Sequence, residues 1–485
     1  MIGLTPHLFL ILICGECMKT ICIIGAGPSG LFCAHKILKD FHKTGIKEKF
    51  QIIMFEQGNE PSGRFCPGTD DGICRKCDCC AILSGGGGAG LFSDGKIIQD
   101  LNVGGHNDTI FALSAETKAR YISYVTRTLL NYDGVSEYKG KPDTDACNVL
   151  DERLAAAGLK AKYYGVLHMG TANLTHILNG FIGELENSKL IHIQYRTRVT
   201  GIVSVDNQYM IYSNGKQLCV ADYLVMAVGK SGADWLKHIL LPLGVLFKKT
   251  GYYFGLRVES FQKYLKPLAD LSFGPKIYRE LADGRKIKMH CFCRKGNVIM
   301  TNYNGCVSAG GHSPYTEKNA LFAEGEYGNF NILLSYPNKS EEKTIFERFS
   351  SMASDRLLVQ TLKDFKENRE PDPRRTAPYA RAAWARPVNI RQAIEDDFFA
   401  KEMLGFLSAL DSIFPGIGND DNLLYGPVFE WCMDTVSVSP QMETSQSNLF
   451  AVGDGAGLSQ GIIYSSATGI LAAESIMEKM NRNEA

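Results

Sequence analysis

The sequence has no surplus of charge of either sign and no apolar run long enough to cross a membrane. Lys and Arg together number 52, as do Asp and Glu, so the chain has no overall field that would hold a nucleic-acid backbone or an acidic membrane surface. The apolar stretch at residues 8–14 (LFLILIC) is too short to span a bilayer, and no Lys or Arg precedes it as in a secretion signal. We therefore expect a cytoplasmic protein with neither a nucleic-acid nor a membrane partner.

Further absences narrow the class of protein. The sequence shows no internal repeat, coiled-coil heptad or low-complexity segment, and no serine or cysteine nucleophile with an identifiable base, so hydrolytic chemistry has no support. Its 485 residues predict two or three domains. The fifteen cysteines lie in close pairs or in apolar strands, which favours thiols or ligands over disulfides. Met18 opens the first predicted strand, and residues 1–17 are interpreted as an upstream extension or a misassigned start, with a genuine export signal as the alternative.

A strand, a glycine turn and a helix follow one another in TICIIGAGPSGLFCAHKILKD, residues 20–40. Gly25 permits a tight turn, Gly27 lets the backbone approach a pyrophosphate at the helix N-terminus, and Gly30 lets helix and strand pack closely. The next predicted strand ends at Glu56, where a carboxylate would accept hydrogen bonds from an adenosine ribose. The combination predicts a dinucleotide-binding site, and the alternative is a purely structural glycine turn.

The C-terminal segment SNLFAVGDGAGLSQGIIYSSATGILAAESI, residues 447–476, favours FAD as the dinucleotide. It resembles the last strand, turn and helix of flavoproteins with two dinucleotide-binding domains. In those proteins an Asp, here Asp454, bonds the ribityl and phosphate region. The following helix directs its positive N-terminus at the N1–C2 carbonyl edge of the flavin. The alternative is a plain strand-turn-helix.

A third segment, residues 196–232, contains short strands separated by Asp-Asn and Asn-Gly turn signals and ends in the apolar run YLVMAVG. In the flavoprotein fold the first of these strands places a backbone amide and carbonyl, at about Val199, beside the adenine. MAVGKSG, with Ala227 and Gly229, resembles the strand end that closes over the adenosine. Three separated segments thus predict one discontinuous FAD-binding domain.

The stretch RFCPGTDDGICRKCDCC, residues 64–80, leaves three interpretations open. Cys74, Cys77 and Cys80 have the spacing of an iron–sulfur or zinc segment, and Cys66 would supply a fourth ligand. The same thiols could instead form a redox-active dithiol near the flavin, or they could merely line the substrate cavity or a loop.

The following stretch SGGGGAGLFSDGK, residues 84–96, cannot form a regular helix or strand, because repeated glycine costs too much backbone entropy. We expect its backbone amides to lie against the ribityl chain or the ring edge of the flavin. Asp94 and Lys96 then come within reach of the ring, where Lys96 could stabilise negative charge at N1/O2 or protonate a product. An exposed, salt-bridged turn is the alternative. His168 could contact flavin or substrate, or serve as a cap.

Residues 236–440 are expected to form an inserted β-rich α+β substrate domain. Strands are predicted at 252–260, 286–294, 296–303 and 329–337, and helices at 346–365 and 398–414. Cys291 and Cys293 are expected to share one face of a strand and to be ordinary strand residues.

The segment 373–391 is rich in arginine and could dock an anionic substrate or an NADPH phosphate, or be a solvated connector. No second GxGxxG follows a strand, so a dedicated NAD(P) domain is not expected. Electrons would come from transiently docked NAD(P)H, from the substrate or from an external carrier.

Together these motifs resemble a widespread family of FAD-dependent dehydrogenases, also called NAD(FAD)-utilising dehydrogenases, most of whose members have no assigned substrate. The resemblance runs through IIGAGPSGLFCA, the cysteine and glycine stretch, HMGTANL, AVGKSGADWL, GYYFGLRVES, CFCRKGNVI and VGDGAGLSQGI. It implies an FAD-binding redox enzyme.

We therefore expect an α/β protein with a Rossmann-like FAD-binding domain at 18–235, a substrate domain at 236–440 and a return to the first domain at 441–485. The expected reaction is hydride or electron transfer through flavin N5 to or from a small organic molecule, an anionic one among the candidates. A flavin, iron–sulfur or thiol-based electron-transfer or redox-sensing protein is the alternative, and a flavin enzyme acting on RNA is disfavoured by the neutral charge. The expected cofactor-binding residues are Gly25, Gly27, Pro28, Ser29, Gly30, Glu56, Gln57, Arg64, Gly88, Ala89, Gly90, Val199, Ala227, Gly229, Gly453, Asp454, Gly455, Gly461 and Ile462.

Overall fold

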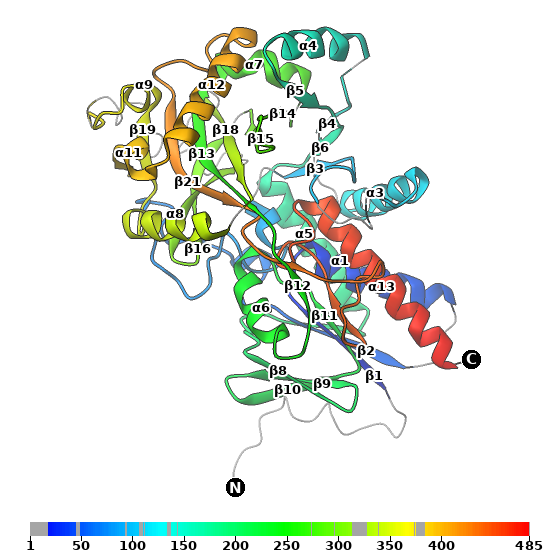
Figure 1. Ribbon diagram of the computed structural model, residues 1–485. Coiled ribbons are helices and arrows are strands. Elements are labelled where there is room, and N and C mark those ends of the chain that lie inside the picture. The colour runs from blue at the N-terminus through cyan, green and yellow to red at the C-terminus, as the bar shows by residue number, and fades with distance from the viewer. Residues whose placement is uncertain are drawn as a thin grey trace.

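The molecule has two halves in space, and a five-stranded parallel sheet forms the centre of one of them (Figure 1). Its order is β23-β11-β1-β2-β7, and each neighbouring pair is parallel. The strands are β1 (Lys19–Ile24), β2 (Phe50–Phe55), β7 (Ile191–Gln194), β11 (Tyr223–Met226) and β23 (Leu449–Ala451). β1 lies at the centre because its apolar side chains are buried on both faces of the sheet. This arrangement confirms the predicted Rossmann-like α/β class.

The structure, a computed structural model, describes residues 18–44, 49–92, 95–105, 110, 112–132, 137–142, 144–272, 274–294, 296–312, 327–337, 339–372, 374 and 384–484. The predictions for residues 1–17, for Asp94 and for most of the arginine-rich segment 373–391 lie outside the described residues. None of the described helices is both long enough and apolar enough to cross a membrane.

Two helices from opposite ends of the chain pack against this sheet and against each other (Figure 1). They are α1 (Pro28–Thr44) and α13 (Ile462–Glu484). Their close approach depends on glycine, because a Cβ on Gly469 would lie 2.0 Å from the Ser29 carbonyl oxygen. The first and last parts of the chain therefore meet beside the strand ends, as the discontinuous domain requires.

Smaller elements surround the parallel sheet. The helices are α3 (Ala115–Leu130), α5 (Thr171–Asn187) and α6 (Ala233–Leu240). The strands form an antiparallel sheet of β8 (Gly201–Val205), β9 (Gln208–Ser213) and β10 (Lys216–Ala221), a second of β3 (Lys96–Ile98), β6 (Val166–His168) and β4 (Glu137–Lys139), and the pair β12 (Phe247–Lys248) and β22 (Thr435–Val436).

An eight-stranded, mostly antiparallel sheet organises the other half (Figure 1). In spatial order its strands are β20 (Arg386–Pro387), β19 (Leu358–Thr361), β21 (Leu423–Glu430), β13 (Tyr252–Phe261), β18 (Tyr327–Tyr336), β15 (Lys286–Cys293), β14 (Lys276–Glu280) and β5 (Lys160–Lys162). The hairpin of β16 (Asn297–Tyr303) and β17 (Cys306–His312) accompanies it. The helices are α4 (Thr144–Ala156), α7 (Gln262–Leu271), α8 (Lys339–Met352), α9 (Leu362–Lys366), α11 (Ile390–Ile394) and α12 (Asp397–Ile413). A β-rich second half is thus present.

The single helix predicted over residues 346–365 is wrong. The chain there forms the end of α8, then strand β19, then the short helix α9. Val359 and its neighbours in β19 are fully buried and pair with β21, so tertiary burial overrides the helical pattern of the flanking residues.

Each half has its own hydrophobic core. The second core includes Leu150 and Leu154 of α4, and β5 pairs with β14, so a piece of the N-terminal segment joins the second half. The chain therefore crosses between the two halves more often than the three-segment boundaries imply, and those boundaries stay predictions.

Candidate functional site

A cavity of about 630 Å³ lies between the carboxyl ends of the parallel strands and the eight-stranded sheet. This volume is within the range of about 300–1,000 Å³ that is usual for small-molecule and cofactor sites. Open parallel sheets place their ligands at the same edge. The lining residues that the sequence predicted are Gly25, Gly27, Pro28, Ser29, Glu56, Gln57, Gly88, Ala89, Gly90, Lys96, Val199, Ala227, Gly229, Asp454, Gly461 and Ile462. Segments far apart in the sequence thus meet at one cavity.

In the glycine turn after β1, the protein's own packing requires glycine at Gly25 and Gly30 but not at Gly27. Gly25 has a φ of +111°, and a Cβ there would lie 2.4 Å from the Ala227 carbonyl oxygen. A Cβ on Gly30 would lie 2.1 Å from the Gly25 carbonyl oxygen, so Gly30 serves strand–helix packing and does not line the cavity. A Cβ on Gly27 would meet only the Gly88 Cα, at 3.7 Å. A side chain at Gly27 would therefore clash little with the protein and would occupy space in the cavity.

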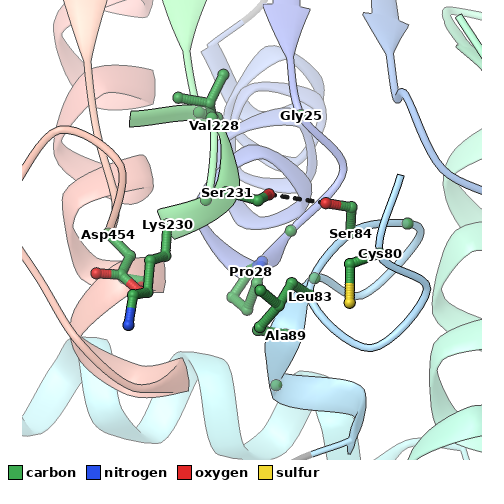
Figure 2. Close-up of a pocket in the computed structure, with 18 of the residues that line it drawn as sticks. Gly25, Pro28, Cys80, Leu83, Ser84, Ala89, Val228, Lys230, Ser231 and Asp454 are labelled. Carbon is green, nitrogen blue, oxygen red and sulfur yellow. Dashed lines mark hydrogen bonds between the residues drawn. The ribbon is translucent and has the colours of Figure 1, made fainter. Parts of the chain in front are cut away.

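The glycine-rich loop lies directly against this turn, with Gly88, Ala89 and Gly90 on the cavity. Figure 2 shows Ala89 of the loop beside Pro28 of the turn. The Gly87 amide donates to the Ala26 carbonyl oxygen at 2.9 Å. Gly88 has a φ of +64°. Side chains would prevent this approach of two backbones, which explains the run of glycines.

Arg64 contacts the glycine-rich loop on the side away from the cavity, and it does not line the cavity. Its guanidinium donates to four backbone carbonyl oxygens, those of Ala81, Ile82, Gly86 and Gly88, at 2.6 to 3.0 Å. The residue is 6% exposed, and burial lowers its pKa to about 10 although the Glu56 carboxylate acts in the opposite direction. Arg64 therefore positions the loop and does not line the predicted cofactor site.

Glu56 follows β2 and is buried at the cavity wall. One carboxylate oxygen accepts from the Ala26 amide and the other from the Gly58 amide, both at 2.9 Å. These bonds fix the orientation of the carboxylate, and each oxygen keeps a further lone pair for a hydroxyl donor. Gln57 lies beside it and donates to the Ser84 hydroxyl at 3.1 Å.

Asp454 lies on the cavity wall, in the turn between β23 and α13. Burial raises its pKa to about 6, Lys230 opposes this shift and Glu430 adds to it. Figure 2 shows Lys230 beside Asp454. The first residue of the long helix α13, Ile462, also lines the cavity, so the positive end of that helix faces the same space.

The neighbouring glycines Gly453 and Gly455 do not line the cavity but shape the Asp454 turn. The Gly453 amide donates to the Thr468 hydroxyl at 3.1 Å, and the Gly455 amide donates to the Val228 carbonyl oxygen at 3.0 Å. Across the cavity from Asp454, Figure 2 shows Ser84 of the glycine-rich loop hydrogen-bonded to Ser231, an oxygen–oxygen distance of 2.7 Å.

The structure does not bring the cysteines predicted as metal ligands together as one ligand set among the residues that it describes. Among the described residues no group of three or more His, Cys, Asp or Glu side chains could hold a metal ion. Cys66 and Cys74 pack against the small apolar cluster around β16 and β17, and Asn302 donates to the Cys74 sulfur at 3.2 Å. Cys77 and Cys80 line the cavity instead. Two-residue spacing did not make the four thiols converge, because the loop places two of them in a different apolar environment.

The cavity thiols lie near the dinucleotide motif of the chain. Burial raises the pKa of Cys79, and the charges of Glu56 and Arg198 act on it in opposite directions, so this thiol is close to both. Cys77, Cys79 and Cys80 therefore gather at the Glu56 end of the cavity. The described residues give no support to the metal interpretation, and the redox-dithiol and cavity-lining interpretations both stay open.

Lys96 lies on the cavity as expected, at the start of β3. Its ammonium donates to the Phe292 carbonyl oxygen, a contact with β15. Lys230, which the sequence analysis did not select, also lines the cavity, and it donates to the Phe429 carbonyl oxygen. Its position directly after Gly229 in the predicted motif could have indicated it. Two lysines thus reach across from the parallel-sheet half to the other sheet.

The eight-stranded sheet contributes a wall that the sequence analysis missed. Its titratable members are Lys276 of β14, His290 and Cys291 of β15, and Glu430 of β21. Burial opposes ionisation of Glu430, but the surrounding basic side chains outweigh it and lower the pKa to about 2. Burial lowers the pKa of Lys276 to about 7, and the charge of Lys288 adds to this effect.

The expectation that Cys291 and Cys293 share one face is wrong. The register of β15 against β18 shifts between His290 and Cys293, and Cys291 has a left-handed φ of +55°. This bulge leaves Cys293 fully buried and exposes Cys291 to the cavity. A hydrogen bond with Cys293 is the largest influence that lowers the pKa of Cys291 to about 6, and Arg257 contributes against burial.

Comparison with known proteins supports the fold. Residues 23–90 match the family described as NAD(P)-binding Rossmann-like domain. No match to the chain is found among curated proteins.

Similar solved structures include 2,6-dihydroxypyridine-3-hydroxylase from Arthrobacter nicotinovorans, with 12% identity, a TM-score of 0.42 and coverage of 97% of this chain and 85% of the other. A flavoprotein/dehydrogenase from Cytophaga hutchinsonii has 10% identity, a TM-score of 0.39 and coverage of 94% and 76%. Glycine oxidase from Geobacillus kaustophilus has 11% identity, a TM-score of 0.38 and coverage of 95% of both chains. At these values the function has to be argued from the site.

Proposed function

We propose that the protein is an FAD-dependent oxidoreductase of the dehydrogenase or reductase type that acts on a small organic molecule. The observation that carries this proposal is one cavity that is lined both by Glu56 with the Gly25–Gly30 turn and by Asp454 with the N-terminus of α13. The two ends of an extended dinucleotide need different partners, and these two groups supply them from opposite ends of the chain.

The cavity wall fits such a ligand because several of its glycines leave room for one. A Cβ on Gly229 or on Gly461 would contact no protein atom within 4 Å, and one on Gly27 would meet a single atom at 3.7 Å. Gly461 has a φ of +92°, a conformation that favours glycine by itself. At Gly27 and Gly229, however, nothing in the protein requires glycine. A bulky molecule held close to the backbone would require it.

Each lining group has a role that follows from its chemistry. The amides at the start of α1 suit a pyrophosphate, and Glu56 suits the ribose hydroxyls. Asp454 suits the hydroxyls of the ribityl chain. The N-terminus of α13, with Lys96 and Lys230, provides a positive field at the far end of the cavity, where negative charge would develop. FAD, when bound, supplies hydride or electron transfer at its N5 atom.

The first experiment identifies the ligand. Protein purified without added cofactor is denatured, and the released compound is identified by mass spectrometry and quantified by absorbance. We expect about one FAD per chain, and anaerobic mixing with NADH, NADPH or artificial carriers then shows which donor reduces it. Protein that is colourless and does not take up added FAD would contradict the proposal, and a tightly held NAD(P) would replace it.

A further inference from the structure

The wall formed by β14, β15 and β21 has no role in the dinucleotide motifs, yet it carries a dense set of charged groups. Lys276, His290, Cys291 and Glu430 all line the cavity there. Lys96 and Lys230 reach the same end of the cavity from the other half of the molecule. This wall is therefore the part of the cavity that can contact a second molecule.

Glu430 is already committed to other basic groups. Lys288 lies 3.5 Å from one of its carboxylate oxygens, and His290 lies 3.6 Å from the other. The residue is 8% exposed, so its charge needs the Lys288 ammonium, because burial lowers the pKa of His290 to about 3 and leaves that imidazole neutral. Glu430 therefore has Lys288 as its ion-pair partner within the wall, and its charge also acts on Lys276.

Lys276 is the cation of this wall that has no direct partner. Its ammonium makes no hydrogen bond or ion pair with any residue that the structure describes, although it lies in a largely buried position on the cavity. The ammonium groups of Lys96 and Lys230, in contrast, each donate to a backbone carbonyl oxygen. An ammonium in a buried position without a partner is unfavourable, and an anionic ligand would remove that cost.

Cys291 marks the position next to this ammonium. The strand bulge turns its side chain into the cavity, and the charges of Cys291 and Lys276 are close enough to affect each other. A left-handed conformation is unfavourable at a residue other than glycine and is kept where surrounding structure or function demands it. The bulge thus places a thiol where a ligand bound to Lys276 would contact it.

We propose that this wall binds the carboxylate group of a small organic acid, with the Lys276 ammonium as its counter-ion and the Cys291 thiol in contact with the bound molecule. This inference deepens the proposed function, on which it rests, by naming the substrate class as carboxylic acids. It concerns the chain's own side chains and can be measured without turnover.

The test compares two alkylating reagents on the purified holoprotein. Iodoacetate carries the proposed carboxylate and iodoacetamide is its neutral counterpart. Both alkylate thiolates, so the ratio of their rates at one cysteine cancels the thiolate fraction of that cysteine. Rates are measured for each cysteine by peptide mass spectrometry. Cys77, an exposed thiol of the Cys-rich loop, is the internal reference.

We expect the iodoacetate-to-iodoacetamide ratio at Cys291 to exceed that at Cys77 by roughly threefold to tenfold, the effect of one partly buried charge pair. In Lys276→Gln the ratio at Cys291 should fall to that of Cys77. Lys266→Gln, a change of a lysine that is 68% exposed on α7, should leave it unchanged. Equal ratios at the two cysteines in the unaltered protein would overturn the proposal.

A second measurement covers the case that Lys276→Gln does not fold. Benzoate and benzamide are added separately to the unaltered protein during labelling with iodoacetamide. Benzoate should protect Cys291, whereas benzamide at equal concentration should not. Equal protection by both, or none by either, would overturn the proposal. The flavin absorbance of the same samples reports the proposed function independently, so the two proposals can fail separately.

Discussion

In the glycine turn, some glycines are required by the fold, and another leaves room for the proposed ligand. Gly25 and Gly30 are fixed by the protein's own backbone, because a Cβ at either position would overlap a carbonyl oxygen. At Gly27 the protein itself leaves room for a side chain, and the proposed pyrophosphate would take that room. Sequence alone could assign these three roles, since spacing determines them. It could not assign Cys291, because a strand bulge reverses the side-chain alternation on which such a prediction depends.

Replacement of Gly27 by Val should therefore remove the cofactor and keep the fold. The isopropyl group would occupy the position proposed for the pyrophosphate, and a Cβ at Gly27 meets only the Gly88 Cα within 4 Å. We expect at least a tenfold loss of flavin content, measured by absorbance after purification, with an unchanged circular dichroism spectrum. Gly183→Ala, in helix α5 where a Cβ meets nothing within 4 Å, is the matched control. A fully yellow Gly27→Val protein would exclude the pyrophosphate position.

We expect the buried charge of Asp454 to lower the stability of the fold while it contributes to FAD binding. Its pKa is raised to about 6 in the folded protein, so burial of its charge destabilises the fold as the pH rises from about 4 through 6. Asp454→Asn should raise the melting temperature of the flavin-free protein at pH 8 and have little effect near pH 4, where Asp454 is also uncharged. The same variant should bind FAD more weakly. A melting temperature that falls at pH 8 would contradict this reasoning.

We expect the alkylation rate of Cys291 to depend on pH differently from that of other thiols. Its pKa is about 6, so the rate of its alkylation by iodoacetamide should level off above about pH 7, whereas an ordinary thiol continues to gain rate to pH 9. The hydrogen bond with Cys293 and the charges of Arg257 and Lys96 lower the pKa, and Glu430 opposes them. Removal of the Cys293 thiol in Cys293→Ala should shift the profile to higher pH. The profile is measured by peptide mass spectrometry.

At the scale of elements, the molecule depends on segments that have no regular structure of their own. The glycine-rich loop is held by one arginine from behind and by the glycine turn in front. Strands and helices with clear apolar patterns, such as β1, β13 and α12, were predictable from sequence. The helix predicted at 346–365 failed where β19 inserts between α8 and α9, because pairing with β21 decides the structure of a short apolar run.

The arginine behind the loop provides a test at this scale. Arg64→Ala would leave four backbone carbonyl oxygens without their donor, and we expect a loss of about 3 kcal/mol in the free energy of unfolding. Flavin affinity should fall as well. Urea denaturation measures the first effect and limited proteolysis of residues 81–90 reports loosening of the loop. Arg374→Ala is the control, because that side chain is 90% exposed and its loss should be nearly neutral. Equal stability of the two variants would refute the role of Arg64.

For the whole molecule, the cavity exists only because two cores face each other. The parallel-sheet half was predictable, since its motifs carry local signals for a nucleotide. The other wall was not, because Lys276, His290, Cys291 and Glu430 lie on three strands that no sequence spacing links. The convergence of four cysteines failed for the same reason, as the folded path of the loop separates them.

Hydrogen exchange tests the proposed extent of the bound cofactor. Addition of FAD to flavin-free protein should slow exchange in residues 25–30, in 84–90 and in 453–462, which are distant in sequence but share one cavity. Protection confined to 25–30 and the end of β2 would indicate a ligand that occupies only the Glu56 end. The exposed hairpin turn between β8 and β9 is the reference segment.

The first strand of the parallel sheet lies at its centre, and the last strand, β23, lies at its edge and leads into the Asp454 turn and α13. During synthesis the ribosome therefore produces the β1 side of the cavity more than four hundred residues before the β23 side. Until those final residues emerge, the nascent polypeptide has nothing to close over its ligand. If the proposed cofactor needs both sides of the cavity, we expect it to bind only after translation, and a chain cut short before β23 should not retain it.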